Sequence, residues 1–433
     1  MNKYILLLAM LVAGGAQAQE RLTLQDAIAR TLQHNFDIQI ANVAKEQAIR
    51  NNTLGNAGFS PSVAAGVTVS GSRNNVQSDL ANGSKQNNPN AVNTNVNPVL
   101  TVNWTIFDGG RMFLVKKQLN ELEALGDIQL KTQMQTMVSR TIQMYAQVTL
   151  QQKRLIAVDT ALRLSQERLK LADLKYRTGA GAKFDYVTAL VDLSARRDDS
   201  LTYLATFAQA CDSLSVLMGT NEGKLYRVDD SLQINMRLQP TDKDRLRDIN
   251  LSLSAFRRSA DISHISADIA RTYALPTLTF NGGYIYSRST SATGFALFSQ
   301  TYGANGALNL SVPLFMGGNI RRQARVASLQ AMRDELLYER QNTIVGRQYR
   351  TAWRSYTFSI AAYRLANDNI GYAKEAVDIQ SARFKLGAGT TLELRQAEND
   401  YVLALIRLYT AEYNVKVNET QVLELENKLV QTN

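Results

Sequence analysis

Four segments of the chain alternate between apolar and polar residues, the pattern of a β-strand whose two faces meet different surroundings. Residues 61–71 and 98–107 show this alternation in the first half of the chain, and residues 277–286 and 308–314 show it in the second half. We therefore predict four strands of about ten residues each, two in each half.

Two long stretches carry the pattern of helices packed as a coiled coil. Apolar residues recur every seven positions in the first of them, at Leu155, Leu162, Leu169 and Tyr176. Proline, which breaks helices, is absent from residues 99–239 and from the chain after Pro313. Each long helix would extend roughly 105 Å if continuous. The predicted helices cover residues 109–178 and 317–386, and the helices that run back cover residues 184–218 and 392–430.

The two halves of the chain repeat each other. Residues 107–110 (FDGG) match residues 315–318 (FMGG) at an offset of 208, whereas Asn35 matches Asn250 at an offset of 215. A period of about 210 residues is too long for a solenoid and indicates a tandem duplication of a whole fold. The offset changes between the members of each strand pair, in polar stretches that we interpret as one loop at two lengths, residues 72–97 and 287–305.

This duplication divides the chain into four segments. Residues 1–18 have a basic start, an apolar run and an Ala-Gln-Ala cleavage site, which predicts a secretory signal peptide. Residues 19–218 form the first repeat, of a helix, two strands and a long helical hairpin whose tip lies near residues 179–183. Residues 219–248, rich in charge and turn formers, form a connecting equatorial segment. The second repeat has the same parts, with its tip near 387–391, and covers residues 249–433.

Each long helix ends at a Gly-Ala-Gly sequence, within YRTGAGAKF (residues 176–184) and FKLGAGTTL (residues 384–392). Glycine takes the left-handed conformation that a helix end needs, so these positions predict tight turns. A phosphate-binding loop is the alternative, but no strand precedes either segment and neither fits G-x-x-x-x-G-K-[ST]. The turn glycines are Gly179, Gly181, Gly387 and Gly389.

The composition contains no recognisable catalytic or ligand-binding group. The formal net charge is +10, but bases and acids are interspersed along the helical segments, as on a solvated surface. His34 and His264 are the only histidines and do not occupy equivalent positions in the two repeats. Cys211 lies in an apolar helical stretch, where a buried inert thiol is expected. We therefore predict a protein that is not an enzyme, without cofactor, metal site or nucleic-acid partner.

Alternating strands in an exported chain fit either a soluble sandwich or the wall of a transmembrane barrel. The long polar stretch at residues 72–97 and the long helical hairpins favour the barrel. Four strands cannot close a barrel, and each unpaired backbone group in lipid costs several kcal/mol, so chains must complete one another's sheet. Eight strands leave a lumen filled by side chains, whereas twelve leave room for a channel. These arguments predict a trimer.

The chain resembles the outer membrane efflux protein family, the TolC-like channel-tunnels. The resemblance runs from residues 22–42 to the last helix and rests on the order of the leading helix, the FDGG segment with its echo, and the two tips. It implies a homotrimer with a twelve-stranded barrel in the outer membrane lipid and a helical tunnel in the periplasm. It also implies a periplasmic adaptor (membrane fusion) protein and an inner-membrane pump, for which the channel is a passive exit duct.

The resemblance further implies roles for residues at the tips. Asp185 matches an aspartate that helps to hold the entrance shut, and Glu393 matches an acidic position that rings it. The family's gate tyrosine falls on Phe384 and its gate arginine on Gly389, so the family's closing contacts cannot all form here. Glu393 has a second reading, as a carboxylate that favours the start of a helix. The adaptor is expected to dock near Gly179, Gly181, Gly387 and Gly389.

Two other classes of protein stay open at this point. A periplasmic coiled-coil adaptor or scaffold would share the helical hairpins but would not need four strands suited to lipid. A passive porin would need the strands but not helices of 70 residues.

Overall fold

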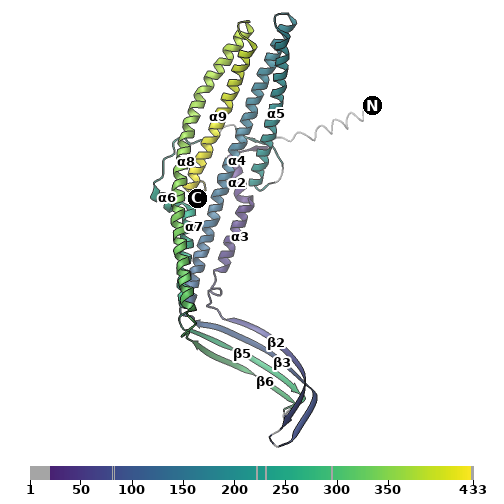
Figure 1. Cartoon of the computed structure of the whole chain (residues 1–433), viewed down its shortest axis with the longest axis vertical. Coiled ribbons are helices and arrows are strands. Elements are labelled where there is room, and N and C mark those ends of the chain that lie inside the picture. The colour runs from purple at the N-terminus through teal and green to yellow at the C-terminus, as the bar shows by residue number, and fades with distance from the viewer. Residues whose placement is uncertain are drawn as a thin grey trace, which may run out of the picture. The chain divides into compact units, whose positions relative to one another are not determined.

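The structure is a computed structural model that describes residues 20–79, 81, 83–220, 223–229, 232–293 and 296–430. The predicted signal peptide lies outside the described residues. Figure 1 labels the helices and the four long strands. The elements follow in chain order: β1 (Glu20–Leu22), α2 (Leu24–His34), α3 (Phe36–Asn51), β2 (Ser62–Asp79), β3 (Lys85–Phe107), α4 (Arg111–Arg177), α5 (Lys183–Leu217), β4 (Tyr226–Val228), α6 (Lys243–Ile249), α7 (Leu251–Thr272), β5 (Thr277–Ser291), β6 (Phe298–Ser311), α8 (Asn319–Lys385) and α9 (Thr391–Leu425).

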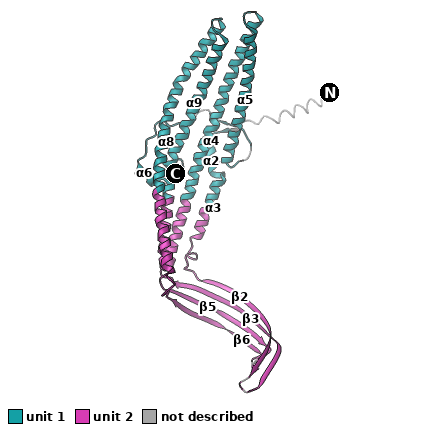
Figure 2. Cartoon of the chain, in the orientation of Figure 1, with its two compact units in different colours: residues 1–43, 128–254, 340–433 teal, residues 44–127, 255–339 magenta. Residues whose placement is uncertain are grey.

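The chain divides into two compact units, which Figure 2 colours separately. Unit 1 contains most of the helical residues and is formed by the described parts of residues 1–43, 128–254 and 340–433. Unit 2 contains the four long strands and is formed by the described parts of residues 44–127 and 255–339.

The helices confirm the predicted duplication. Helices α4 and α8 each have 67 residues, and α5 and α9 each have 35, with every boundary displaced by the same 208 positions. The predicted long helices differ from the observed ones by two residues or fewer at either end, while α9 ends at Leu425 rather than at residue 430. Along the described chain, no helix combines the length and the apolar character needed to cross a membrane.

The strands of unit 2 form one antiparallel sheet in the order β2-β3-β5-β6. Ser62 lies opposite Asn103 in the first hairpin. The two sequence offsets, 215 and 208, carry this pair onto Thr277 and Ser311, which lie opposite each other in the second hairpin. The duplication therefore extends to the register of the backbone hydrogen bonds. The β3–β5 pairing joins the two repeats.

The strands are longer than predicted, with 18, 23, 15 and 14 residues. The prediction of polar loops over residues 72–97 and 287–305 was wrong, because most of both stretches belongs to the strands. The ladder of backbone hydrogen bonds continues where both faces carry Asn, Ser and Thr. Alternation appears only where the two faces meet different surroundings, so it marks part of each strand and misses its polar end.

In unit 1, an asparagine at the equivalent position of each repeat bonds the end of the returning helix of the same repeat. The Asn35 side chain donates to the carbonyl of Leu217 at the end of α5, and the Asn250 side chain donates to the carbonyl of Leu425 at the end of α9, both at 2.9 Å. Each bond satisfies a carbonyl that a helix end leaves without a partner. Nearby, Cys211 is fully buried and burial raises the pKa of its thiol, as expected for an inert cysteine.

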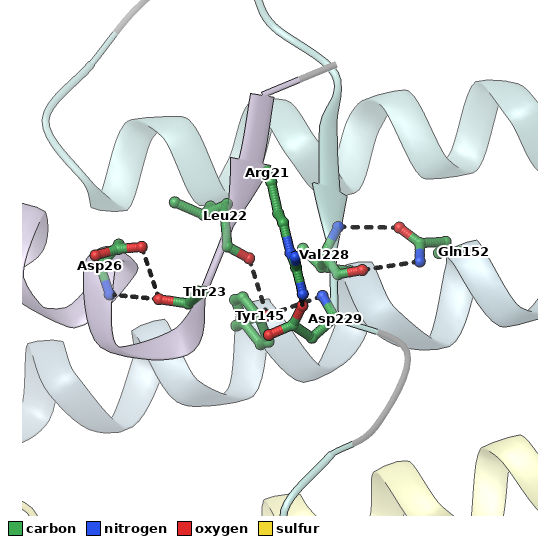
Figure 3. Close-up of polar contacts among 8 residues, drawn as sticks. All are labelled: Arg21, Leu22, Thr23, Asp26, Tyr145, Gln152, Val228 and Asp229. Atoms are coloured by element: carbon green, nitrogen blue, oxygen red, sulfur yellow. Dashed lines mark hydrogen bonds and ion pairs between the residues drawn. The ribbon is translucent and has the colours of Figure 1, made fainter. Parts of the chain in front are cut away.

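Side chains of α4 hold the start of the described chain against the connecting segment (Figure 3). Strands β1 and β4 pair in parallel. The Tyr145 hydroxyl donates to the carbonyl of Leu22 at 3.0 Å and accepts from the backbone N–H of Asp229 at 3.3 Å. Gln152 bonds both backbone groups of Val228, at 3.0 and 3.1 Å. This small sheet therefore depends on α4 for its position.

We expect Tyr145→Phe to lower the free energy of unfolding by about 1–3 kcal/mol, because it leaves a buried carbonyl and a backbone N–H without their partner. Tyr413→Phe is the control, since the hydroxyl of this partly buried tyrosine makes no hydrogen bond to any described residue. Thermal unfolding in detergent measures both variants. Equal midpoints for the two would show that the Tyr145 hydroxyl does not hold β1 and β4.

Candidate functional site: the turns between the long helices

The two turns of unit 1 share one backbone geometry. Gly179 and Gly387 have φ angles of +74° and +78°, the left-handed conformation expected of glycine after a helix. The next residues close the helix ends, since Ala180 N–H donates to the carbonyl of Lys175 at 2.8 Å and Ala388 N–H donates to that of Arg383 at 2.9 Å. The repeated Gly-Ala-Gly sequence thus encodes the same turn twice.

The second glycine of each turn serves a different purpose from the first. Neither Gly181 nor Gly389 has a positive φ angle. A Cβ atom at Gly181 would lie 2.9 Å from the Cβ of Lys175, and one at Gly389 would lie 3.2 Å from the backbone nitrogen of Phe384. These glycines allow the returning chain to approach the helix end closely. The prediction of left-handed conformations holds for the first glycine of each pair only.

The returning helices start differently. Thr390 precedes α9 and accepts from the Glu393 N–H at 3.2 Å, while the Glu393 carboxylate accepts from the Thr390 N–H at 2.9 Å. This reciprocal pair is a capping box. The Thr390 backbone hydrogen bond, with help from the Arg383 guanidinium, holds the pKa of the exposed Glu393 carboxyl below its ordinary value. Ala182 occupies the equivalent position before α5 and provides no side-chain cap.

The aromatic residues of the two turns also have different surroundings. The ring of Tyr176 stacks on that of Tyr186 at 5.8 Å between centroids. Phe384 is buried, and the ammonium group of Lys175 lies 3.9 Å from its ring centroid and donates to its carbonyl at 2.8 Å. Lys175 therefore links the two turns within one chain. Sequence reasoning missed it, although a base directly precedes the aromatic residue in both motifs.

Asp185, the predicted gate carboxylate, lies in the first turn of α5 and is half-buried. No described residue of the same chain forms an ion pair with it. Arg395, one of the bases nearest to the turns in sequence, is 3.6 Å from Asp192 instead. A closing contact of Asp185 with another copy stays a prediction, as do the gate roles of Phe384, Gly389 and Glu393.

A buried cluster of charged residues joins α4, α5 and α9, and the sequence analysis did not predict it. Arg168 on α4 is 3% exposed and bonds Asp192 on α5 at 2.9 Å and Glu398 on α9 at 2.5 Å. Burial raises the pKa of the Glu398 carboxyl, while the Arg168 guanidinium opposes that effect. The cluster joins the two hairpins. Glu398 lies 230 residues from Arg168 in the sequence, so no local sequence pattern predicts the cluster.

Known proteins share this arrangement of two pseudo-equivalent helical hairpins. The sequence profile of the outer membrane efflux proteins matches residues 27–220 and 244–427. The chain therefore belongs to the outer membrane efflux protein family.

Individual relatives agree with the family assignment. The chain is 24% identical to the outer membrane protein TolC of Vibrio cholerae over 66% of its own length and 69% of TolC. It is 22% identical to the proteases secretion protein PrtF of Dickeya chrysanthemi over 95% of its own length and 89% of PrtF. The crystal structure of the Campylobacter jejuni CmeC outer membrane channel superimposes with a TM-score of 0.77 at 15% identity, over 94% of this chain and 85% of CmeC.

These matches confirm the predicted family, the α+β fold with its internal duplication, and the localisation in the outer membrane with an extension into the periplasm. They also confirm the predicted function as an outer-membrane efflux channel. The matched proteins are channels and secretion proteins rather than enzymes. The predicted repeat boundaries and tip residues stay predictions.

Glu393→Gln separates the structural role of this residue from an electrostatic one. Glutamine also completes a capping box, so we expect α9 to start unchanged while the preference of the channel for cations falls several-fold. Because the pKa of Glu393 is lowered, the preference of the unaltered channel should persist below the pH at which an ordinary glutamate titrates.

Reversal potentials in planar bilayers measure this preference. Glu375→Gln, at an exposed position of α8, is the matched control. Unchanged selectivity in Glu393→Gln would leave Glu393 as a capping residue alone.

Proposed function

We propose that three copies of the chain close a twelve-stranded barrel in the outer membrane, and that their helical hairpins continue as a periplasmic tunnel. The assembly gives a passive exit duct for substrates that an inner-membrane pump drives through a periplasmic adaptor. One observation carries the proposal: the sheet order β2-β3-β5-β6 leaves β2 and β6 with one free edge each in the described chain.

The faces and edges of this sheet support closure by further copies. Val63, Val67 and Val69 on β2 are 63–68% exposed, and Leu308 and Leu310 on β6 are 67% and 66% exposed. Apolar side chains repeated at every second position suit a lipid-facing wall. Free edges do not suit lipid, because each unpaired backbone group there costs several kcal/mol.

The duplication specifies how two copies would join. Within the chain, Val102 on β3 lies opposite Gly282 on β5. The same sequence offsets carry this pair onto Leu310 on β6 and Val67 on β2. The β6 edge of one copy therefore fits the β2 edge of the next in the register already used between the two repeats. Three copies leave a channel, whereas two would leave a lumen filled by side chains.

The two rival classes fit the structure less well. A periplasmic scaffold has no need of a four-stranded sheet with exposed apolar positions. A passive porin has no need of helices of 67 residues. The names of the relatives, an efflux family and a secretion protein, support a duct that works with a pump.

The proposed seam predicts a specific cross-link. In a Cys211→Ala background, Val67→Cys combined with Leu310→Cys should form disulfide-linked dimers and trimers, because facing residues of antiparallel strands lie within disulfide range. Val63→Cys with Leu310→Cys is the control, with its partners displaced by about 13 Å along the strands. Non-reducing gels of outer membranes measure both. A Val67→Cys and Leu310→Cys variant that stays monomeric on these gels contradicts the trimeric barrel.

We further propose that the adaptor docks on the turns that hold Gly179, Gly181, Gly387 and Gly389. The turns are exposed and occur twice per chain, which gives six similar sites in a trimer. Their shared backbone geometry supports a single mode of contact for both.

Gly179→Val and Gly387→Val should each strain a left-handed residue by about 1–3 kcal/mol and distort the turn. We expect export, measured as efflux of a fluorescent dye, to fall while the amount of protein in the outer membrane stays constant. Gly371→Val is the control, because Gly371 lies in α8 with open space around it. Full export in both turn variants would place the docking site elsewhere.

A further inference from the structure

The duplication relates a contact inside the chain to a contact between copies. Helix α4 of the first repeat packs against α9 of the second, and all of these contacts lie within unit 1. If repeats alternate around a ring, the equivalent contact is made by α8 of one copy and α5 of the next. The observed contact between α4 and α9 within the chain therefore predicts the geometry of the contact between α8 of one copy and α5 of the next.

Buried ion pairs hold the internal contact. Arg168 bonds Glu398 at 2.5 Å, with side chains 3% and 10% exposed. Lys153 bonds Glu412 at 2.6 Å, with both side chains 12% exposed. A buried charge is tolerated when it has a partner and is strongly unfavourable when it lacks one.

Both members of each pair change together at the equivalent positions. The offset of 208 carries Arg168 onto Ala376 and Glu398 onto Leu190. It likewise carries Lys153 onto Ala361 and Glu412 onto Leu204. Each ion pair between α4 and α9 thus becomes an alanine facing a leucine. Asp192, the other partner of Arg168, stays a carboxylate at the equivalent position, Asp400, which accepts from the Gln396 side chain at 3.0 Å.

These four residues are not covered within the described chain. Leu190 and Leu204 on α5 are 39% and 46% exposed, and both alanines of α8 are exposed. Between copies, they would form an apolar contact that removes them from water.

Two related cavities support the same alignment. A cavity of about 500 Å³ between α8 and α9 has a further wall formed by Thr132 and Thr136 of α4. The equivalent cavity between α4 and α5 is about 750 Å³, includes Val216 and is also lined by Tyr413 of α9. In the proposed contact, α8 of a second copy supplies Arg340 and Ile344 as the missing wall. Two other contacts between α4 and α9 do not become apolar pairs: Ser139 with Glu424 maps onto Arg347 and Val216, and Arg154 with Thr410 maps onto Ala362 and Thr202.

We propose that α5 of one copy packs against α8 of the next, with Leu190 opposite Ala376 and Leu204 opposite Ala361. The ion pairs between α4 and α9 then prevent the internal contact and the contact between copies from being exchanged. If α9 met α8 of another copy, Glu398 and Glu412 would be buried against alanines. If α4 met α5 of another copy, Lys153 would be buried against a leucine without a carboxylate partner, and Arg168 would keep only its ion pair with Asp192 of its own α5. Both errors bury at least one charge without a partner, so the helices select the alternating order. This inference rests on the proposed trimer.

Transplanting a charge pair tests the sorting. Leu190→Glu alone should lower the fraction of trimer that survives mild SDS by about tenfold, because it buries a carboxylate without a partner. Leu190→Glu with Ala376→Arg recreates the internal pair and should restore that fraction to within about twofold. Leu174→Glu, at a 59% exposed leucine of α4, is the control and should change little. Rescue absent from the double variant overturns the proposed register.

A second measurement separates this inference from the trimer itself. Leu190→Cys with Ala376→Cys, treated with a short bifunctional thiol reagent in the Cys211→Ala background, should link copies to one another. The Val67→Cys and Leu310→Cys seam is measured in parallel. Seam trimers without a helix cross-link would overturn the helix contact and leave the proposed function standing. Failure of the seam as well would overturn both.

Discussion

The backbone hydrogen bonds at the edges of the four-stranded sheet are the constraint on which the rest of the structure depends. Strands β3 and β5 are paired on both sides, whereas β2 and β6 are paired on one side within the described chain. In water such edges are managed by charges, prolines or bulges. In the hydrocarbon of a membrane they must be closed. A chain of an outer-membrane efflux family with these edges is therefore one part of a larger wall.

Duplication provides the geometry for that closure. The hydrogen bonds of Asn35 and Asn250 have equivalent partners and the same length. The duplication therefore preserves contacts that lie within each repeat. Arg168 and Ala376 are equivalent in position but differ in charge: Arg168 faces Glu398 within the chain, and Ala376 faces Leu190 of another copy in the proposed trimer. Positions with the same residue in both repeats make contacts within a repeat. Positions with different residues make contacts outside it. This distinction needs no second sequence, since the chain contains its own comparison.

The sequence predicted the helices better than the strands for a physical reason. Glycines at the turns mark the helix ends, and the absence of proline indicates that the helices between them are unbroken. The observed ends agree closely with the predicted ones. The strand ends were missed because alternation depends on the contrast between two faces, which fades where both are polar. Thr390 and Glu393 form a capping box with a readable sequence signature. Lys175 and Arg168 have partners more than 200 residues away, so only the folded chain reveals them.

The two turns have the same backbone conformation but are held by different side-chain contacts. The second turn is tied by its capping box and by Lys175 over Phe384. The first has a Tyr176–Tyr186 stack and no side-chain cap. Phe384 is buried inside the chain, and Gly389 has no side chain, so neither offers a polar group to another copy. Asp185 is half-buried and forms no ion pair within the described chain, which leaves its carboxylate available. The first turn therefore lacks the capping box that holds the second, and the gate role of Asp185 stays a prediction.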